Sequence, residues 1–149
     1  MKYLKLLFVI CLLSSSGFAS GQALKGVREV AIVIENLDDD ATKCLISKDL
    51  LDASVRLPLS NSKIKIVSRE LYPNAYVYAN VNILTRGDLC IGSIEFSFNK
   101  YSNSEKEVGT FWTKETLLSR GKADFSRDVS QIIESYAKQL ISAWLQANL

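Results

Sequence analysis

The chain contains no histidine, and its 149 residues include only three cysteines and two prolines. Without histidine there can be no Ser-His-Asp triad, no Cys-His pair and no histidine-ligated zinc, and no imidazole can act as a general acid or base. Carboxylate, lysine or tyrosine chemistry, or serine with lysine, would remain. We find no motif for any of these, and we therefore predict a protein that is not an enzyme and that uses no cofactor and no metal.

Two acidic groups provide the alternatives to that prediction. Glu95, Glu105 and Glu115 could supply the two carboxylates of a glycosidase, although the sequence does not place them together. Asp38, Asp39 and Asp40 could offer oxygen ligands to calcium, but the EF-hand spacing is missing. We interpret the run 38–40 as a solvated loop with acids that favour the start of a helix.

The overall charge is almost balanced, with 18 basic and 16 acidic residues. Lys2 and Lys5 belong to a predicted export signal, and without these two the chain has 16 residues of each sign. A neutral domain has no global field that would attract nucleic acid or anionic lipid, although local patches remain possible. We expect no nucleic-acid partner.

The amino-terminal 21 residues have the order of a secretory signal peptide: two lysines, an apolar run over 6–13, and then small residues. The run is much shorter than the roughly 20 residues that span a bilayer. We predict cleavage after Ala19 or after Gly21, with an uncleaved amino-terminal anchor as the alternative. No later segment is long and apolar enough to span a membrane, so we expect a periplasmic or secreted protein that is soluble once the signal is removed.

Cys44 and Cys90 remain after cleavage. A pair of cysteines in an exported chain is most simply a disulfide, and two free thiols are the alternative. Such a bond would close a loop of 46 residues, from 44 to 90.

The hydrophobic pattern predicts one α+β domain over 22–149. Alternating runs predict strands at 27–35, 63–67, 75–85, 89–101 and 108–119. Ser47 should cap a short helix that Pro58 ends, and Ser126 should cap a long amphipathic helix over 127–147. We expect a two-layer sandwich: a mostly antiparallel sheet of about five strands, with both helices on one face.

The strand at 75–85 places aromatic and amide side chains on the face opposite its apolar residues. Tyrosine and asparagine are common in binding surfaces, because the ring supplies contact area and the polar tip supplies direction. A solvated sheet face with cross-strand aromatic pairs is the alternative. Our candidate binding surface consists of Tyr72, Tyr76, Tyr78, Asn80 and Asn82.

The whole pattern resembles a family of small exported bacterial proteins of uncharacterised function. The resemblance lies in the opening strand VAIVIENLDDDA, the segment TKCLISKDLLDASV, the strand AYVYANVNIL, the segment DLCIGSIEFSF, the strand GTFWTKETLL and the final LQANL. It supports a pairing of Cys44 with Cys90 and brings no known activity.

We therefore expect a non-enzymatic periplasmic or secreted protein-interaction module. It would be an accessory subunit of a cell-envelope assembly such as a secretion or flagellar complex, with envelope proteins as partners. The alternative is a periplasmic protein that binds a small ligand or lipid in a pocket between the sheet and the carboxy-terminal helix.

Overall fold

The structure is a computed structural model that describes residues 17–71, 74–101 and 108–149. Most of the predicted export signal, Tyr72 of the candidate surface and Glu105 lie outside these residues.

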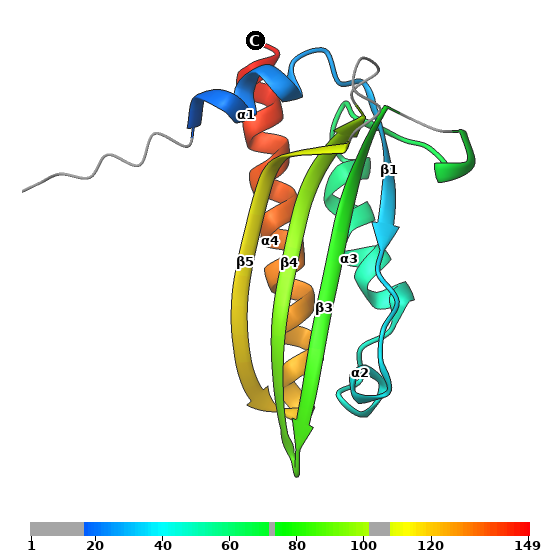
Figure 1. Ribbon diagram of the computed structural model, residues 1–149, viewed down its shortest axis with the longest axis vertical. Coiled ribbons are helices and arrows are strands. Elements are labelled where there is room, and N and C mark those ends of the chain that lie inside the picture. Colours follow the sequence, from blue (N-terminus) through cyan, green and yellow to red (C-terminus); the bar gives the residue numbers. More distant parts are fainter. Residues whose placement is uncertain (1–16, 72–73, 102–107) are drawn as a thin grey trace, which may run out of the picture.

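Five strands form one mixed sheet in the order β2-β1-β3-β4-β5 (Figure 1). They are β1 (Glu29–Ile34), β2 (Lys65–Ile66), β3 (Ala75–Arg86), β4 (Leu89–Tyr101) and β5 (Val108–Gly121). The long strands β3, β4 and β5 form the expected antiparallel meander. Strand β1 runs parallel to both of its neighbours, β2 and β3, so one side of the sheet is parallel.

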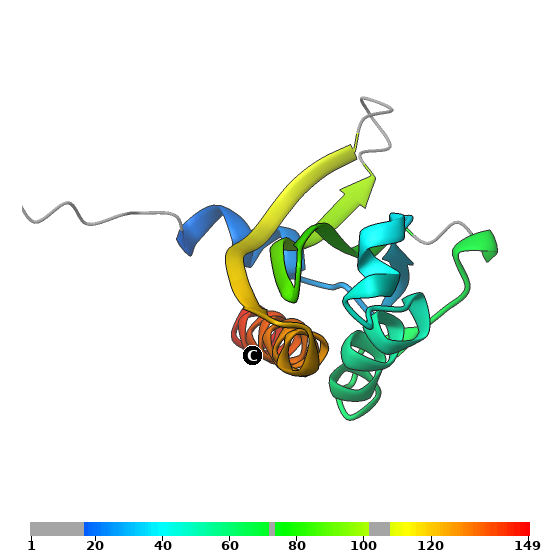
Figure 2. The same ribbon diagram turned by 90° about the horizontal axis from the view of Figure 1, so that it is seen from below.

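The helices are α1 (Gly17–Leu24), α2 (Asp39–Lys43), α3 (Lys48–Ser60) and α4 (Lys122–Ala147), with a 3₁₀ turn η1 at Arg69–Leu71. Helices α3 and α4 lie side by side on one face of the sheet, as the view along the strands shows (Figure 2). The hydroxyl groups of Ser54 and Ser130 join them at 2.6 Å. The expected α+β fold with its helical layer on one face is confirmed.

Helix α3 begins as the sequence predicts and ends later. The Ser47 hydroxyl accepts a hydrogen bond from the Leu50 amide at 3.2 Å, which satisfies one of the free amides of the first turn. Pro58 lies within the helix and does not end it. The helix continues to Ser60 because the next amides, of Asn61 and Ser62, still reach the carbonyls of Pro58 and Leu59.

Helix α4 begins at Lys122, five residues before the expected start, so the prediction of Ser126 as its cap was wrong. Gly121 is the capping residue and makes no side-chain hydrogen bond to the helix. The first turn is held from outside, because the Lys122 amide donates to the Asp88 carbonyl of the β3–β4 hairpin at 3.1 Å. The added turn also places Phe125 in the core, where it is fully buried.

The acidic run 38–40 forms the start of a short helix, α2. Asp38 caps it by accepting a hydrogen bond from the Ala41 amide at 2.8 Å, and Asp39 and Asp40 lie in its first turn. The interpretation as a loop was therefore wrong for Asp39 and Asp40, while their predicted role at a helix start is confirmed.

The core fills the space between the sheet and the helices. Its largest fully buried side chains include Phe96, Phe98, Phe125, Leu51, Leu59, Ile94 and Ile133. Gly92 of β4 leaves room for one of them, because a Cβ at this position would lie 2.7 Å from Cζ of Phe125.

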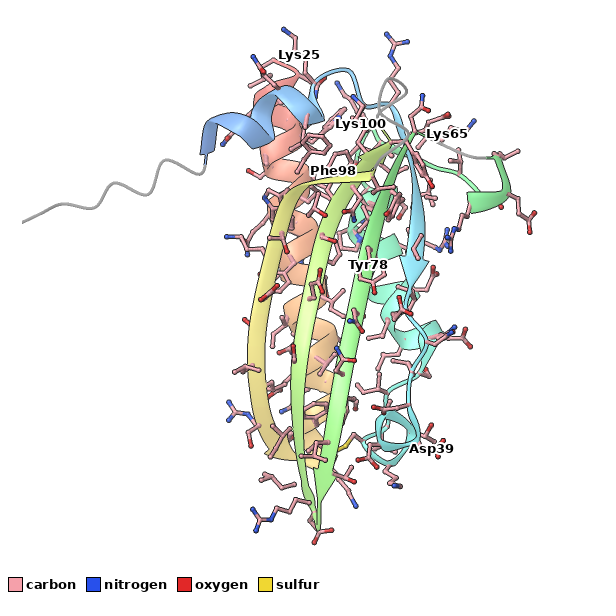
Figure 3. The ribbon with its side chains drawn as sticks, viewed as in Figure 1. Lys25, Asp39, Lys65, Tyr78, Phe98 and Lys100 are labelled. Atoms are coloured by element: carbon pink, nitrogen blue, oxygen red, sulfur yellow. A yellow bond between two sulfur atoms is a disulfide. The ribbon has the colours of Figure 1, made fainter. Side chains whose placement is uncertain are left out.

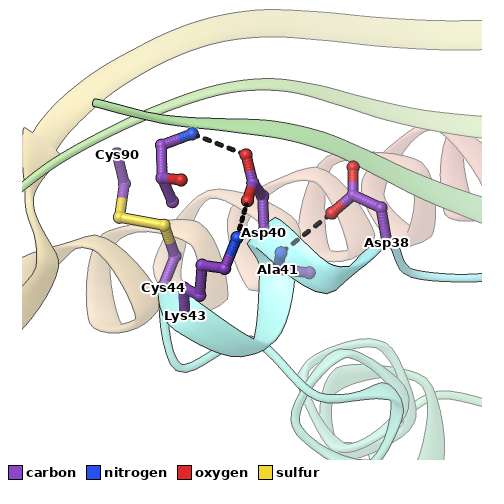
Figure 4. The surroundings of a disulfide bond; sticks show 7 residues. Asp38, Asp40, Ala41, Lys43, Cys44 and Cys90 are labelled. Atoms are coloured by element: carbon purple, nitrogen blue, oxygen red, sulfur yellow. Dashed lines mark hydrogen bonds and ion pairs between the residues drawn. A yellow bond between two sulfur atoms is a disulfide. The ribbon is translucent and has the colours of Figure 1, made fainter. Parts of the chain in front are cut away.

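The predicted Cys44–Cys90 disulfide is confirmed (Figure 4). It joins the end of α2 to β4, and both cysteines are fully buried.

Candidate interaction surface

The two faces of the sheet have different surroundings. Residues 77, 79, 81 and 83 of β3 face the helices and are buried, as are Ile94, Phe96 and Cys90 of β4. The side chains of opposite parity project from the other face, which no helix of the described chain covers (Figures 1 and 2). We call this second surface the open face.

Tyr76 and Tyr78 lie on the open face and are half-buried. The Tyr78 hydroxyl donates a hydrogen bond to Oε2 of Glu35 at 2.6 Å. Burial, together with this bond, raises the pKa of Tyr78 to about 12, and the same hydrogen bond lowers the pKa of Glu35. Burial also raises the pKa of Tyr76. Tyr78 therefore uses its polar tip within the chain.

Asn80 and Asn82 follow on the same face, nearer the β3–β4 turn. Asn82 is exposed and lies directly opposite Ser93 of β4. Asn80 lies opposite Glu95, and its Oδ1 atom is buried without a hydrogen-bond partner among the described residues. An unsatisfied buried acceptor is costly to the stability of the fold.

Glu95 and Glu115 occupy directly opposite positions on β4 and β5. Like charges that face each other across strands destabilise a sheet. The two carboxylates stand side by side on one face and do not flank a space from opposite sides, which is the arrangement a glycosidase needs for its sugar. Their position gives no support to the carboxylate-enzyme alternative.

Sequence reasoning missed the most exposed apolar part of this face, near the β3–β4 turn. It consists of four side chains from three neighbouring strands: Leu84, Leu89, Ile91 and Leu117. Leu84 pairs directly with Ile91, and Leu117 pairs with Ser93, two residues along from Ile91. We call these four residues the apolar patch.

A signal for the apolar patch was present in the sequence. Leu84 has the same strand parity as Tyr76 and Asn82, and Ile91 has the parity of Ser93. Continuing the alternation to the ends of the strands therefore places both apolar residues on the polar face. Exposed apolar groups that gather in one place are typical of interaction sites.

The acidic residues near α2 have structural partners. Asp40 accepts a hydrogen bond from Lys43 Nζ at 2.6 Å and another from the Thr85 amide at 2.9 Å (Figure 4). The hydrogen bond from Lys43, followed by those from Thr85, lowers the pKa of Asp40 to about 2. Within the described ranges, no three His, Cys, Asp or Glu residues are grouped so that they could hold a metal ion.

The fold is similar to that of a bacterial protein of known structure. PelC from Paraburkholderia phytofirmans, solved as a dodecamer of a single-substitution variant, superimposes with a TM-score of 0.51 at 13% identity. The match covers 78% of this chain and 90% of that one.

Two further solved structures are less similar. A minor lipoprotein from Acinetobacter baumannii gives a TM-score of 0.46 at 10% identity, over 80% of this chain and 93% of that one. Rare lipoprotein B from Shewanella oneidensis gives a TM-score of 0.35 at 15% identity. That match covers 80% of this chain and 92% of the other. No protein-family model and no curated protein sequence matches the chain.

The helices of the described chain include none with the length and apolar character needed to cross a membrane.

Proposed function

We propose that this protein is a non-enzymatic interaction module of the bacterial cell envelope, exported by its amino-terminal signal. It joins an assembly through the open face of its sheet. The observation that carries this proposal is the apolar patch, whose side chains contribute little to the core of the monomer. Leu84 is 61% exposed and Leu117 is 83% exposed.

The rest of the open face defines what the partner must offer. Next to the apolar patch lie Asn82 and Ser93, and beyond them the row formed by Asn80, Glu95 and Glu115. Asn82 and the carboxylates of Glu95 and Glu115 provide hydrogen-bond acceptors on this face. The matching partner surface therefore combines apolar side chains with amide, lysine or arginine donors.

The partner is an envelope protein or a second copy of this chain. The dodecamer formed by PelC, which has the same fold, supports self-assembly as one form of this function. The ligand-binding alternative requires a cavity between the sheet and α4, a region where Phe96, Phe125 and Ile133 are fully buried. No specific observation favours it.

The test is a crosslinking pull-down of the tagged protein from its own cell envelope, analysed by mass spectrometry. The wild type is compared with Leu84→Ser/Leu117→Ser on the open face and with Leu57→Ser on α3. Leu57 is a matched control because, like Leu84, it is 61% exposed. We expect the open-face variant to lose its specific partner, or its second copy, while the control retains it. Equal recovery by all three proteins would contradict the proposal.

A further inference from the structure

Although the total charge of the chain is almost balanced, basic and acidic side chains lie at opposite ends of the long axis of the molecule. Lys25, Lys65 and Lys100 lie at the end where both described termini lie, and Asp39 lies at the other end (Figure 3). The basic end, as we call it, carries six basic side chains: Lys25, Arg28, Lys63, Lys65, Arg69 and Lys100.

Strand pairing brings these residues together from distant parts of the sequence. The Lys65 amide donates to the Arg28 carbonyl at 2.8 Å. Ile66 pairs with Val30 in β1, and Lys100 pairs with Ala75, the first residue of β3. The topology of the sheet therefore brings these basic residues to one end of it.

Among the described residues, the basic end carries more positive than negative charge. Three acidic residues lie near it: Glu29, Glu70 and Glu35, whose carboxylate interacts with Arg69. Five basic residues elsewhere form the ion pairs of the described chain: Lys43, Arg56, Arg120, Arg127 and Lys138. Composition alone suggested no attraction to an anionic surface, but the fold creates a local patch that provides it.

The chain enters the domain at this same end. Asn148, just after α4, accepts a hydrogen bond from the Gly26 amide at 2.8 Å and donates one to the Leu24 carbonyl at 3.1 Å. These contacts hold the segment after α1 against the carboxy terminus. The apolar run of the predicted export signal, residues 6–13, precedes α1 in the chain.

Exposed apolar side chains accompany the cations. Leu71 is 71% exposed, and Tyr101 and Val108, which pair across β4 and β5 beside Lys100, are also exposed. Cations with tyrosine and aliphatic side chains between them suit the headgroup region of a membrane, where aromatic rings and lysine stems are favourable.

We propose that the basic end binds the surface of an anionic phospholipid bilayer. With the basic end on the membrane, the long axis of the molecule points away from the bilayer surface. The open face of the sheet then remains accessible to a partner. Each lysine or arginine near such a surface raises the membrane partition coefficient by about fivefold. The attraction weakens as salt screens the charges.

The test uses protein purified from the exported fraction of cells that express the full chain. Its binding to vesicles of phosphatidylcholine, with and without one third phosphatidylglycerol, is measured by co-sedimentation. We expect binding only to the anionic vesicles, with most of it lost at about 1 M salt, where the Debye length is about 3 Å. Lys63→Gln/Lys65→Gln should lower the partition coefficient by roughly 25-fold, and Lys63→Glu/Lys65→Glu by more.

The matched control is Arg86→Glu/Lys122→Glu at the opposite end, which changes the net charge as much as the Lys63→Glu/Lys65→Glu pair does. It should bind within about threefold of wild type, and circular dichroism checks that all variants are folded. Equal binding to neutral vesicles, no binding to anionic vesicles at low salt, or an equal loss in the control would overturn the proposal. Binding to soluble heparin without binding to vesicles would also overturn it.

Discussion

Successive side chains of β3 and β4 point alternately to the two faces of the sheet. One face packs against the helices, and the other is the open face. On the inner face, Val77, Ala79 and Phe96 are fully buried beneath the helices. On the open face, Leu84 and Ile91 remain in contact with water although they are equally apolar. Burial accounts for the inner residues, because it removes apolar surface from water. The outer ones gain little from folding, and we propose that they contact another molecule.

The largest difference between the faces should appear in stability. Phe96 is fully buried and packs edge-to-face against Trp112, with ring centroids 5.9 Å apart. We expect Phe96→Ala to lower the free energy of unfolding by about 3–5 kcal/mol, measured in urea. Leu117→Ala on the open face should change it by less than about 0.5 kcal/mol. Similar losses in both variants would show that the open face is part of the core.

Removal of the disulfide should give the next largest loss of stability, because this bond fastens α2 to the inner side of β4. Closure of its 46-residue loop contributes up to about 4 kcal/mol on the chain-entropy estimate. We expect Cys44→Ala/Cys90→Ala to lose stability on this scale, and reductant to have no further effect on the double variant. A double variant as stable as the oxidised wild type would contradict this role.

Two neighbouring residues of β4, one on each face of the sheet, should show a smaller difference in stability when each is replaced by alanine. Gly92 faces the helices, and an added methyl group would lie 2.7 Å from the Phe125 ring. We expect Gly92→Ala to cost about 1–3 kcal/mol through overpacking. Ser93 faces outward and is exposed, so Ser93→Ala should be nearly neutral. Thermal unfolding of the two variants measures the difference.

The smallest effect concerns the hydrogen bond between Tyr78 and Glu35 on the open face. This bond lowers the pKa of Glu35, so Tyr78→Phe should move that pKa toward its ordinary value of about 4.3. The stabilisation is complete above the ordinary value and is lost as pH falls through the lowered pKa. Carboxyl NMR titration measures the shift, and Tyr76→Phe, which leaves the bond intact, should not produce it.

The sequence predicted the parts of the fold that depend on local pattern. Alternation located β3, β4 and β5, the Ser47 hydroxyl marked the start of α3, and the pair of cysteines indicated the disulfide. The first residue of helix α4 could not be predicted from the sequence. Its first turn depends on a hydrogen bond to the Asp88 carbonyl, which only the folded hairpin brings close. The parallel pairing of β1 with β3 likewise depends on tertiary packing.

The candidate site was predicted in part. Strand parity placed Tyr76, Tyr78, Asn80 and Asn82 on one face, and the structure agrees. Parity does not tell how exposed each residue is, and the two tyrosines are half-buried while the exposed area lies nearer the turn. The register of three strands was needed to bring Leu117 near Ile91, and this register is not visible in any one segment.

The most direct test of the open face is photo-crosslinking in living cells. A photoreactive residue replaces Leu84 in one strain and Leu57 in another, two leucines of equal exposure on opposite layers. The account predicts a discrete crosslinked product, with an envelope protein or a second copy, from position 84 and none from position 57. Products of equal yield from both positions, or a product from position 57 alone, would contradict it.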